Sequence, residues 1–404
     1  MFIVRIRKLI LMDYLARGSV GHNQAYSLAV ANEAALGGMN VEIWCPVNCS
    51  IKSRYAKKIF SEMKPFGRLR LIKQIWERAI EFRSILSRPE FTQDDLILFH
   101  TVFHPFFVSL SLALFGIKLR SKVVVIMRRG LKDKYRTALP AIIQETASWL
   151  MTIPFVFWLN RVVGIGLATD SDLIRDELSK AGLKGVFTLP IPHTRIPVRS
   201  DEKGKPVIGY LGGGRVEKGF DFLPDVAALA LKSNNQTKFI FQTYIEANYF
   251  DSPDMKEAKE KLLELAHQHP KSFKLTEASL SYPAYERLMR QCSIILLPYR
   301  AELYGKGTSG ILAEAVAMGK WVVVPANTWM SAQKQKYDKI VVFDSEKPES
   351  IARAILECEA LDGKIDKKRV TEQIKGWHAF HNPESYISIL RCKVENDDST
   401  QYPS

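Results

Sequence analysis

The sequence has little cysteine, and its few cysteines show no pairing pattern. Five among 404 residues are odd in number and scattered: Cys45, Cys49, Cys292, Cys358 and Cys392. Cys45 and Cys49 have no nearby cysteine or histidine to complete the four ligands of a structural zinc site. We therefore expect reduced thiols, as in a cytoplasmic protein, and no metal.

Long hydrophobic runs are also missing. Residues 102–117 contain His104, Pro105 and two serines, and residues 149–159 contain Pro154. Both fall short of the roughly 18–20 apolar residues of a membrane-spanning helix, so we expect buried helices. Residues 1–15 lack the apolar core and small-residue cleavage site of a signal peptide and read as a first strand.

Positive charge is concentrated in the first half of the chain. Residues 1–200 hold 29 Lys/Arg and 15 Asp/Glu, which gives +14, whereas residues 201–404 hold 28 of each. Residues 51–90 carry 11 basic and 4 acidic side chains, and residues 118–136 carry 8 and 1. This asymmetry indicates that the first half faces something anionic.

Short apolar strands alternate with helical segments along most of the chain, which is typical of an α/β protein with parallel sheets. Strands are expected at 41–45, 96–99, 123–127, 162–169, 186–189, 207–211, 239–242, 273–275, 293–297, 321–324 and 339–343. Prolines and charges at 190–205 mark a linker. We expect domains at 1–195 and 196–380, with 381–404 as a C-terminal helix and tail that packs back on the first domain.

A glycine-rich turn follows the strand at 207–211. Gly212, Gly213 and Gly214 let the backbone approach a phosphate without a clashing Cβ, while Arg215 and Lys218 neutralise a diphosphate. The Lys and Ser/Thr of a Walker A motif are replaced by Phe220 and Asp221, so that motif is excluded.

A second strand–turn–helix segment lies about ninety residues further on. Thr308, Ser309 and Gly310 open a helix, whose backbone N–H groups and dipole favour an anion. Glu314 lies one turn further in an otherwise apolar helix, where it can accept hydrogen bonds from both hydroxyls of a ribose. Together the two segments predict a nucleotide-sugar site.

The motifs GGGRVEKGFD and GTSGILAEAVAMGKWVVVP resemble the carboxyl-terminal domain of GT-B glycosyltransferases, particularly glycosyltransferase family 4. The segment GSVGHNQAYSLAVANEAALGGMNVEIWCP is similar to that family's first glycine loop, helix and second strand. The resemblance implies two Rossmann-like domains whose parallel sheets face a central cleft. It also implies transfer of a sugar, with retention, from a nucleotide-diphosphate donor to a saccharide or lipid-linked acceptor in cell-surface polysaccharide or glycolipid synthesis.

The resemblance assigns roles to individual residues. Arg215 and Lys218 would bind the donor diphosphate and stabilise it as the leaving group, Glu314 would hold the ribose, and the amides at Thr308–Gly310 would contact phosphate or sugar. In the first domain Gly21 would approach the donor, with His22 and Asn23 nearby. His104 matches the family's catalytic cleft histidine, with His100 as the alternative.

One position departs from the family pattern. Lys306 stands eight residues before Glu314, where the family usually has a second glutamate. Glu302 would replace this second glutamate from a longer loop, or Lys306 would pair with phosphate instead. No cofactor is expected, because the nucleotide sugar is a substrate and side chains meet the diphosphate charge.

The basic first half has a natural partner in this scheme. Residues 53–88 have apolar side chains at helix-like intervals, and as an amphipathic segment they would lie on an anionic bilayer. The protein would then be peripheral on the inner face of the plasma membrane. A solvated basic face is the other interpretation.

Other functions remain open. A GT-B sugar epimerase and a non-catalytic partner subunit share the expected fold. A nucleic-acid-binding protein would use the same basic half, but the sequence has no zinc-finger, RNP or recognition-helix signature.

Overall fold

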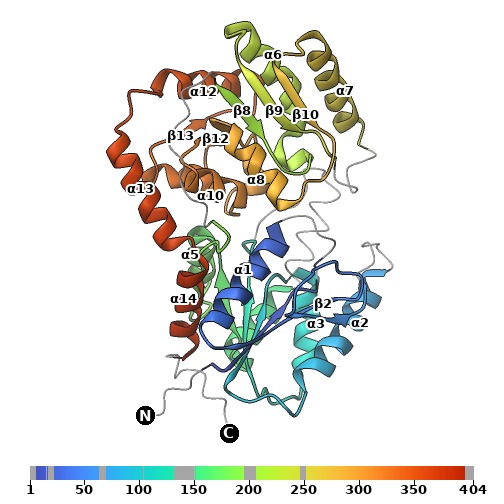
Figure 1. Ribbon diagram of the computed structural model, residues 1–404. Coiled ribbons are helices and arrows are strands. Elements are labelled where there is room, and N and C mark those ends of the chain that lie inside the picture. Colours follow the sequence, from blue (N-terminus) through green and yellow to red (C-terminus); the bar gives the residue numbers. More distant parts are fainter. Residues whose placement is uncertain are drawn as a thin grey trace. The chain divides into compact units, whose positions relative to one another are not determined.

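The computed structural model of the chain describes residues 6–14, 16, 22–62, 70–102, 104–131, 150, 152–194, 206–245 and 252–395. The chain forms two compact units (Figure 1). Unit 1 is Met1–His193 with Asn382–Ser404, and unit 2 is Thr194–His381. Both units are α/β and built on parallel sheets, as the sequence predicts.

Unit 1 contains a seven-stranded sheet in the order β3-β2-β1-β4-β5-β6-β7. Neighbouring strands are all parallel. The strands are β1 (Lys8–Met12), β2 (Asn40–Pro46), β3 (Ala56–Phe60), β4 (Asp95–Phe99), β5 (Lys122–Ile126), β6 (Gly166–Thr169) and β7 (Phe187–Thr188). The central strands β1, β4 and β5 are near-continuous apolar runs because both faces of a parallel sheet are covered.

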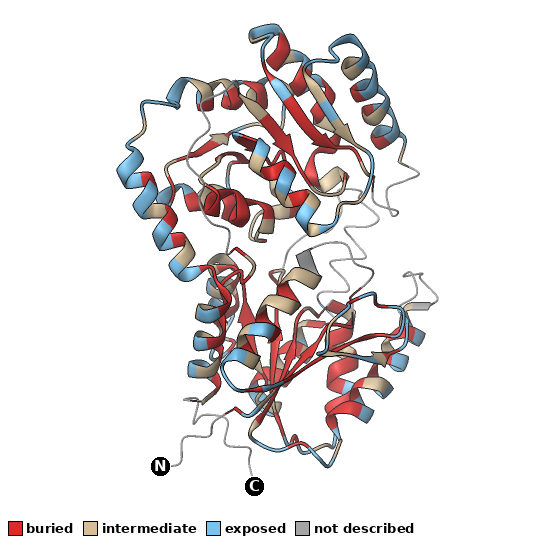
Figure 2. Ribbon diagram, in the orientation of Figure 1, coloured by how far each residue is buried: buried red, intermediate tan, exposed pale blue. Residues whose placement is uncertain are grey.

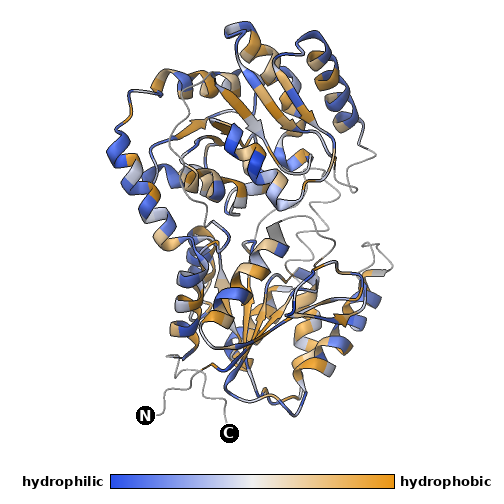
Figure 3. Cartoon of the chain, in the orientation of Figure 1, coloured by the Kyte–Doolittle hydropathy of each residue, from blue (hydrophilic) through white to orange (hydrophobic). Residues whose placement is uncertain are grey.

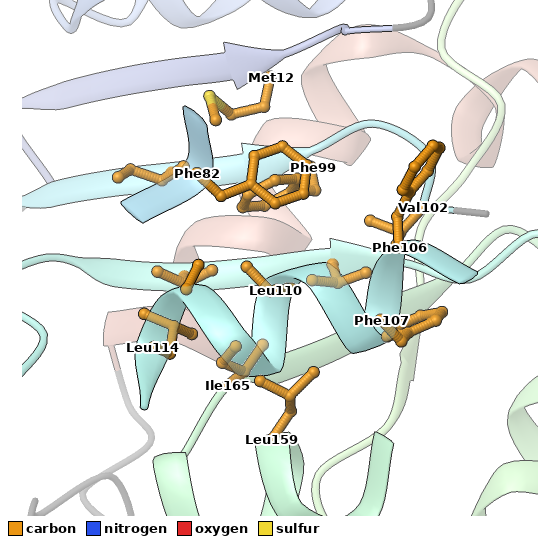
Figure 4. Packing of buried hydrophobic residues seen from close by; sticks show 14 of the residues in the cluster. Met12, Phe82, Phe99, Val102, Phe106, Phe107, Leu110, Leu114, Leu159 and Ile165 are labelled. Atoms are coloured by element: carbon orange, nitrogen blue, oxygen red, sulfur yellow. The ribbon is translucent and has the colours of Figure 1, made fainter. Parts of the chain in front are cut away.

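Alternate residues of these strands enter two separate cores. Ile10, Met12 and Phe99 pack with helices α2 (Arg70–Leu86), α3 (His104–Leu114) and α5 (Asp172–Lys180). Figure 4 shows Phe82 of α2 and Phe106 of α3 near Met12 and Phe99 in this core. Leu9, Leu11 and their neighbours pack with α1 (His22–Leu36) and α14 (Pro383–Glu395). The C-terminal helix thus completes the core of unit 1.

Unit 2 contains a six-stranded parallel sheet in the order β10-β9-β8-β11-β12-β13. Its strands are β8 (Val207–Tyr210), β9 (Lys238–Gln242), β10 (Phe273–Thr276), β11 (Ile294–Leu296), β12 (Trp321–Pro325) and β13 (Ile340–Phe343). One face is covered by α6 (Leu223–Ser233), α7 (Pro253–Gln268) and α12 (Pro348–Leu361). Further helices are α8 (Tyr282–Gln291), α9 (Ala301–Tyr304), α10 (Gly310–Ala317), α11 (Trp329–Ala332) and α13 (Lys367–Phe380).

Burial and hydropathy follow the same layering within each unit. The central strands of both sheets are buried (Figure 2) and apolar, whereas α7 and α13 show polar outer residues (Figure 3). Among the described residues no helix combines the length and apolarity needed to cross a bilayer.

Two expected elements differ in the structure. Residues 56–60, inside the basic stretch expected to be helical, form the edge strand β3, in which Lys57 and Lys58 are exposed and Phe60 is buried. Because an edge strand tolerates charged side chains, its sequence lacks the apolar run that would predict a strand. The expected strand at 162–169 begins only at Gly166, because Leu159–Val163 form a π-helical turn ended by Gly164.

Candidate functional site

In both sheets the chain leaves the sheet centre in opposite directions from two neighbouring strands. In unit 2 these strands are β8, which continues to β9, and β11, which continues to β12 on the other side. Ligands of open α/β sheets bind outside the carboxyl ends of strands at such a switch point. The two motifs predicted from the sequence directly follow β8 and β11.

The glycine turn after β8 touches the helix that follows β11. Gly212 has φ 101°, and an ideal Cβ there would lie 3.1 Å from Ile311 Cδ1 and 3.2 Å from Lys218 Nζ. Its N–H donates to Gln242 Oε1 at 2.8 Å. The absence of a side chain therefore lets the turn, the Lys218 ammonium and helix α10 meet at one point.

Close contacts also require glycine at positions 214 and 219. A Cβ on Gly214 would lie 2.9 Å from the ring of Phe220. At Gly219, φ is 66° and a Cβ would lie 1.9 Å from the carbonyl oxygen of Pro298. Gly219 thus seats the β8 loop directly against the backbone after β11. Gly213, between Gly212 and Gly214, is half-buried.

Arg215 and Lys218 bring two positive charges to this edge. The Arg215 Nη2 donates to the Tyr304 hydroxyl at 3.3 Å, and its Nη1 pairs with Glu217 at 3.3 Å. Lys218 closes the 3₁₀ turn Val216–Lys218 and is nearly buried. In place of the expected helix start, Arg215 is extended and Lys218 lies in a short 3₁₀ turn, and α6 begins only at Leu223.

Helix α10 begins as the sequence predicts. The Ser309 side chain caps it by accepting from the N–H of Leu312, and Gly310 is its first residue. Thr308 is half-buried just before the cap. The Tyr299 hydroxyl hydrogen-bonds with Ser309, and the Tyr299 ring lies 4.6 Å from that of Tyr304. Arg215 and the start of α10 are therefore connected through two tyrosines.

Glu314 is fully buried in α10. Burial raises its pKa to about 8, against the opposing effect of hydrogen bonds from Tyr285 and Tyr282. The Tyr285 hydroxyl donates to Glu314 Oε2 at 2.7 Å. Burial therefore favours the protonated form of the ligand-free carboxyl group. Neither tyrosine is predicted as a site residue, because SYPAYERL has the pattern of an ordinary capped helix start.

Glu302 and Lys306, the two residues linked to the departure from the family pattern, both precede α10. Glu302 is exposed on the four-residue helix α9. Lys306 is half-buried between α9 and α10.

In unit 1 the structure places the predicted histidines after β4. Gly21 lies outside the described residues, and His22 and Asn23 open α1 with side chains that are not described. His104 is the first residue of α3 and is buried, which lowers its pKa to about 2, with a smaller effect from Arg129. This imidazole is neutral at physiological pH.

His100 is neutral for a similar reason and has a defined tautomer. Burial, followed by the charge of Arg128, holds its pKa well below the usual value. The Arg128 Nη2 lies 3.2 Å from His100 Nε2. A guanidinium can only donate, so Nε2 accepts and the ring proton is on Nδ1. His100 Nε2 is thus committed to Arg128.

Arg128 is the centre of a polar cluster that the sequence analysis did not identify. Its Nη1 pairs with Asp170 at 2.5 Å, its Nε donates to Thr101 Oγ1 at 3.0 Å, and its guanidinium lies 4.7 Å from the Tyr26 ring. The signal was present, because His100, Arg128 and Asp170 each follow a predicted strand closely. These side chains line the carboxyl edge of the unit 1 sheet.

Among the described residues no group of three or more His, Cys, Asp or Glu side chains is arranged to hold a metal ion. Arg215 and Lys218 bring positive charge to the unit 2 edge, where an anionic ligand would use it.

Comparison with known proteins supports the predicted resemblance to GT-B glycosyltransferases. Residues 205–360 match the model of the family described as glycosyl transferases group 1. No curated protein sequence matches the chain. Among solved structures, sucrose-phosphate synthase from Thermosynechococcus elongatus is 14% identical with a TM-score of 0.67, over 95% of this chain and 97% of the other.

Two further structures are similar at this level. A structure described as trehalose-6-phosphate from E. coli bound with UDP-2-fluoro glucose is 12% identical with a TM-score of 0.67, over 96% of this chain and 99% of the other. A putative UDP-N-acetylglucosamine 2-epimerase from Listeria monocytogenes is 14% identical with a TM-score of 0.60, over 99% of each chain. The predicted resemblance and the GT-B class of fold are confirmed, and the glycosyl transferases group 1 match lies in unit 2.

Proposed function

We propose that the protein transfers a sugar from a nucleotide-diphosphate donor, bound by unit 2, to a saccharide or lipid-linked acceptor received by unit 1. The observation that carries the proposal is the meeting of two motifs at the switch point between β8 and β11. Gly212 lies against Ile311 of α10 and against the Lys218 ammonium. The family match over 205–360 covers both motifs.

The proposed chemistry depends on stabilising the leaving group. When the bond to the anomeric carbon breaks, the nucleoside diphosphate departs as an anion. Arg215 as a planar fork and Lys218 as a point charge lower that barrier, and the start of α10 adds the positive end of its dipole. In this proposal these groups meet the diphosphate charge without a metal, and configuration at the anomeric carbon is retained.

His104 of unit 1 takes a hydrogen-bonding role in this scheme. Burial keeps its ring neutral across the physiological range, so in this scheme it contacts a sugar hydroxyl by hydrogen bonding and does not act as a titrating acid or base. His100 is the weaker candidate because Arg128 occupies its Nε2.

We further propose that the acceptor is reached at an anionic bilayer. Helix α2 exposes Ile72, Trp76 and Ile80 to 79%, 60% and 55%, at the i, i+4 and i+8 spacing of one helix face. Phe115, exposed to 73%, extends this patch, because Arg83 of α2 donates to its carbonyl oxygen at 2.9 Å. Residues 51–90 carry the basic excess that attracts anionic headgroups. This would make the protein peripheral on the inner face of the plasma membrane, as a participant in polysaccharide or glycolipid synthesis.

The donor proposal is tested by a thermal-shift screen with UDP, GDP, ADP and TDP sugars, followed by product analysis with and without an acceptor. We expect one nucleotide class to stabilise the protein and nucleoside diphosphate release to depend on the acceptor. Isomerised sugar without an acceptor would instead assign an epimerase. Stabilisation without any turnover would assign a non-catalytic binding subunit, and a salt-dependent duplex shift without nucleotide binding would assign a nucleic-acid partner.

A further inference from the structure

Two tyrosines of helix α8 reach the buried carboxyl group of Glu314 on α10. The Tyr285 hydroxyl donates to Glu314 Oε2 at 2.7 Å, and both residues are buried. Tyr282 is the first residue of α8, is half-buried, and hydrogen-bonds with the same carboxyl group. The two tyrosine rings lie 6.2 Å apart with a tilt of 30°.

These contacts determine how Glu314 can be used. A glutamate side chain has three rotatable bonds, and a buried hydrogen bond to one oxygen fixes its orientation. Breaking that bond would leave a buried polar group unpaired, at a cost of about 1–3 kcal/mol. Tyr285 therefore holds Glu314 Oε2 in place.

The contact between Tyr282 and Glu314 is the one that can change. Tyr285 is buried beneath α10. Tyr282 remains partly exposed at the end of α8, and its hydroxyl is the contact that a ligand hydroxyl can replace. A vicinal diol of a ribose offers two donors to a carboxylate, as a single tyrosine hydroxyl does not.

We propose that Tyr285 is a positioning residue of the donor site, which fixes Glu314 so that its carboxyl group accepts from the ribose 2′-hydroxyl in exchange for Tyr282. The inference rests on the proposed function, because it requires a nucleotide donor bound by unit 2. It also takes Glu314 to be the ribose contact, as the family resemblance implies. It adds a consequence for specificity: the site should distinguish ribonucleotides from 2′-deoxyribonucleotides, and this distinction should depend on the Tyr285 hydroxyl.

The test is calorimetric titration of the full chain and of Tyr285→Phe with UDP, GDP and ADP and their 2′-deoxy counterparts. The unaltered protein should prefer the ribonucleotide of its own base by about tenfold or more, since a site built for a hydroxyl rejects the analogue without it. Tyr285→Phe should weaken the ribonucleotide by about tenfold and change the deoxynucleotide by less than about twofold, which removes the preference.

Two further variants keep the test specific. Tyr337→Phe removes another buried hydroxyl of unit 2, one that donates to the Lys320 carbonyl oxygen at 3.0 Å, and should leave both affinities unchanged. Tyr282→Phe should bind the ribonucleotide as tightly as the unaltered protein or more tightly, because the competing hydroxyl is gone. Thermal unfolding of each variant confirms that it is folded.

A preserved preference in Tyr285→Phe, or equal weakening of both nucleotides, would overturn the positioning role. Loss of the preference in Tyr282→Phe or Tyr337→Phe would also overturn it. If no nucleotide binds to the unaltered protein, the proposed function fails and this inference fails with it. Nucleotide binding with an unchanged ratio rejects the inference alone.

Discussion

The guanidinium of Arg215 lies 3.3 Å from the hydroxyl of Tyr304, which joins the loop after β8 to the short helix after β11. Arg300 strengthens the same junction, because its backbone N–H donates to the Glu217 carbonyl oxygen at 3.0 Å and its side chain pairs with Asp221 at 2.5 Å. The two motifs that are about ninety residues apart in the sequence therefore form one structural edge.

Arg215→Ala should remove nucleotide binding while leaving the fold intact. The guanidinium is half-buried directly after the glycine turn in the chain, so its loss should weaken binding of a nucleoside diphosphate by about 2 kcal/mol or more, which is over about twentyfold. Calorimetric titration measures this. Arg353→Ala, an exposed arginine of α12, is the matched control and should bind normally. Equal affinity in both variants would remove Arg215 from the site.

Gly219→Ala should destabilise unit 2 by about 2–4 kcal/mol, because the new Cβ meets the Pro298 carbonyl oxygen in addition to the left-handed backbone strain. Gly363→Ala separates the two effects. Its φ is 86° but nothing lies within 4 Å, so strain alone should cost about 1 kcal/mol. Chemical denaturation of both variants gives the comparison, and similar losses would contradict a steric role for Gly219.

Unit 2 should lose stability as the pH rises from about 5 toward 8. The pKa of Glu314 is raised from 4.5 to about 8 in the folded protein, mainly by burial, so between these values the folded state binds more protons than the unfolded state. Stability from this group is therefore present at low pH and is lost as the carboxyl ionises. Glu314→Gln should show a flatter dependence in thermal unfolding at about pH 5.5, 7 and 8.5. An identical slope in both proteins would refute the buried ionisation.

His104 should not appear in a pH–activity profile. Burial lowers its pKa to about 2, so its ring stays neutral and no inflection near its usual value of 6.5 is expected. His104→Gln, which retains hydrogen-bonding groups, should keep more turnover than His104→Ala, which removes them. An activity limb near pH 6.5 that disappears in His104→Gln would show instead that the imidazole titrates during catalysis.

The exposed face of α2 should bind anionic vesicles. Trp76→Ser with Ile72→Ser removes two exposed apolar side chains and should abolish flotation with phosphatidylglycerol-containing liposomes at low salt. Phe380→Ser, at the end of α13 in unit 2, is the control because its ring is 41% exposed but lies in the other unit. Flotation that survives the α2 substitutions would exclude this face as the membrane contact.

The sequence predicted the parallel strands and the start of α10 because each depends on a local pattern. Apolar runs predict β8 and β11, and Ser309 followed by Gly310 predicts the start of α10. The edge strand β3 was missed because Lys57 and Lys58 interrupt its apolar pattern.

The parts of the candidate site that were missed depend on contacts between distant segments. Tyr285 meets Glu314 across 29 residues, and Arg128 meets Asp170 across 42. Neither pairing leaves a periodic signal in the sequence, because each side chain is also an ordinary residue of its own helix or strand end. The same holds for Gly219, where glycine is required because the carbonyl oxygen of Pro298, on the loop after β11, leaves no room for a Cβ.

The most direct measurement is a structure of the full chain with the nucleoside diphosphate that gives the largest thermal shift. The account predicts the diphosphate against the Gly212 turn, within hydrogen-bond distance of Arg215 and Lys218, and the ribose hydroxyls on Glu314. A nucleotide bound elsewhere on unit 2, with Arg215 and Glu314 both away from it, would contradict the account.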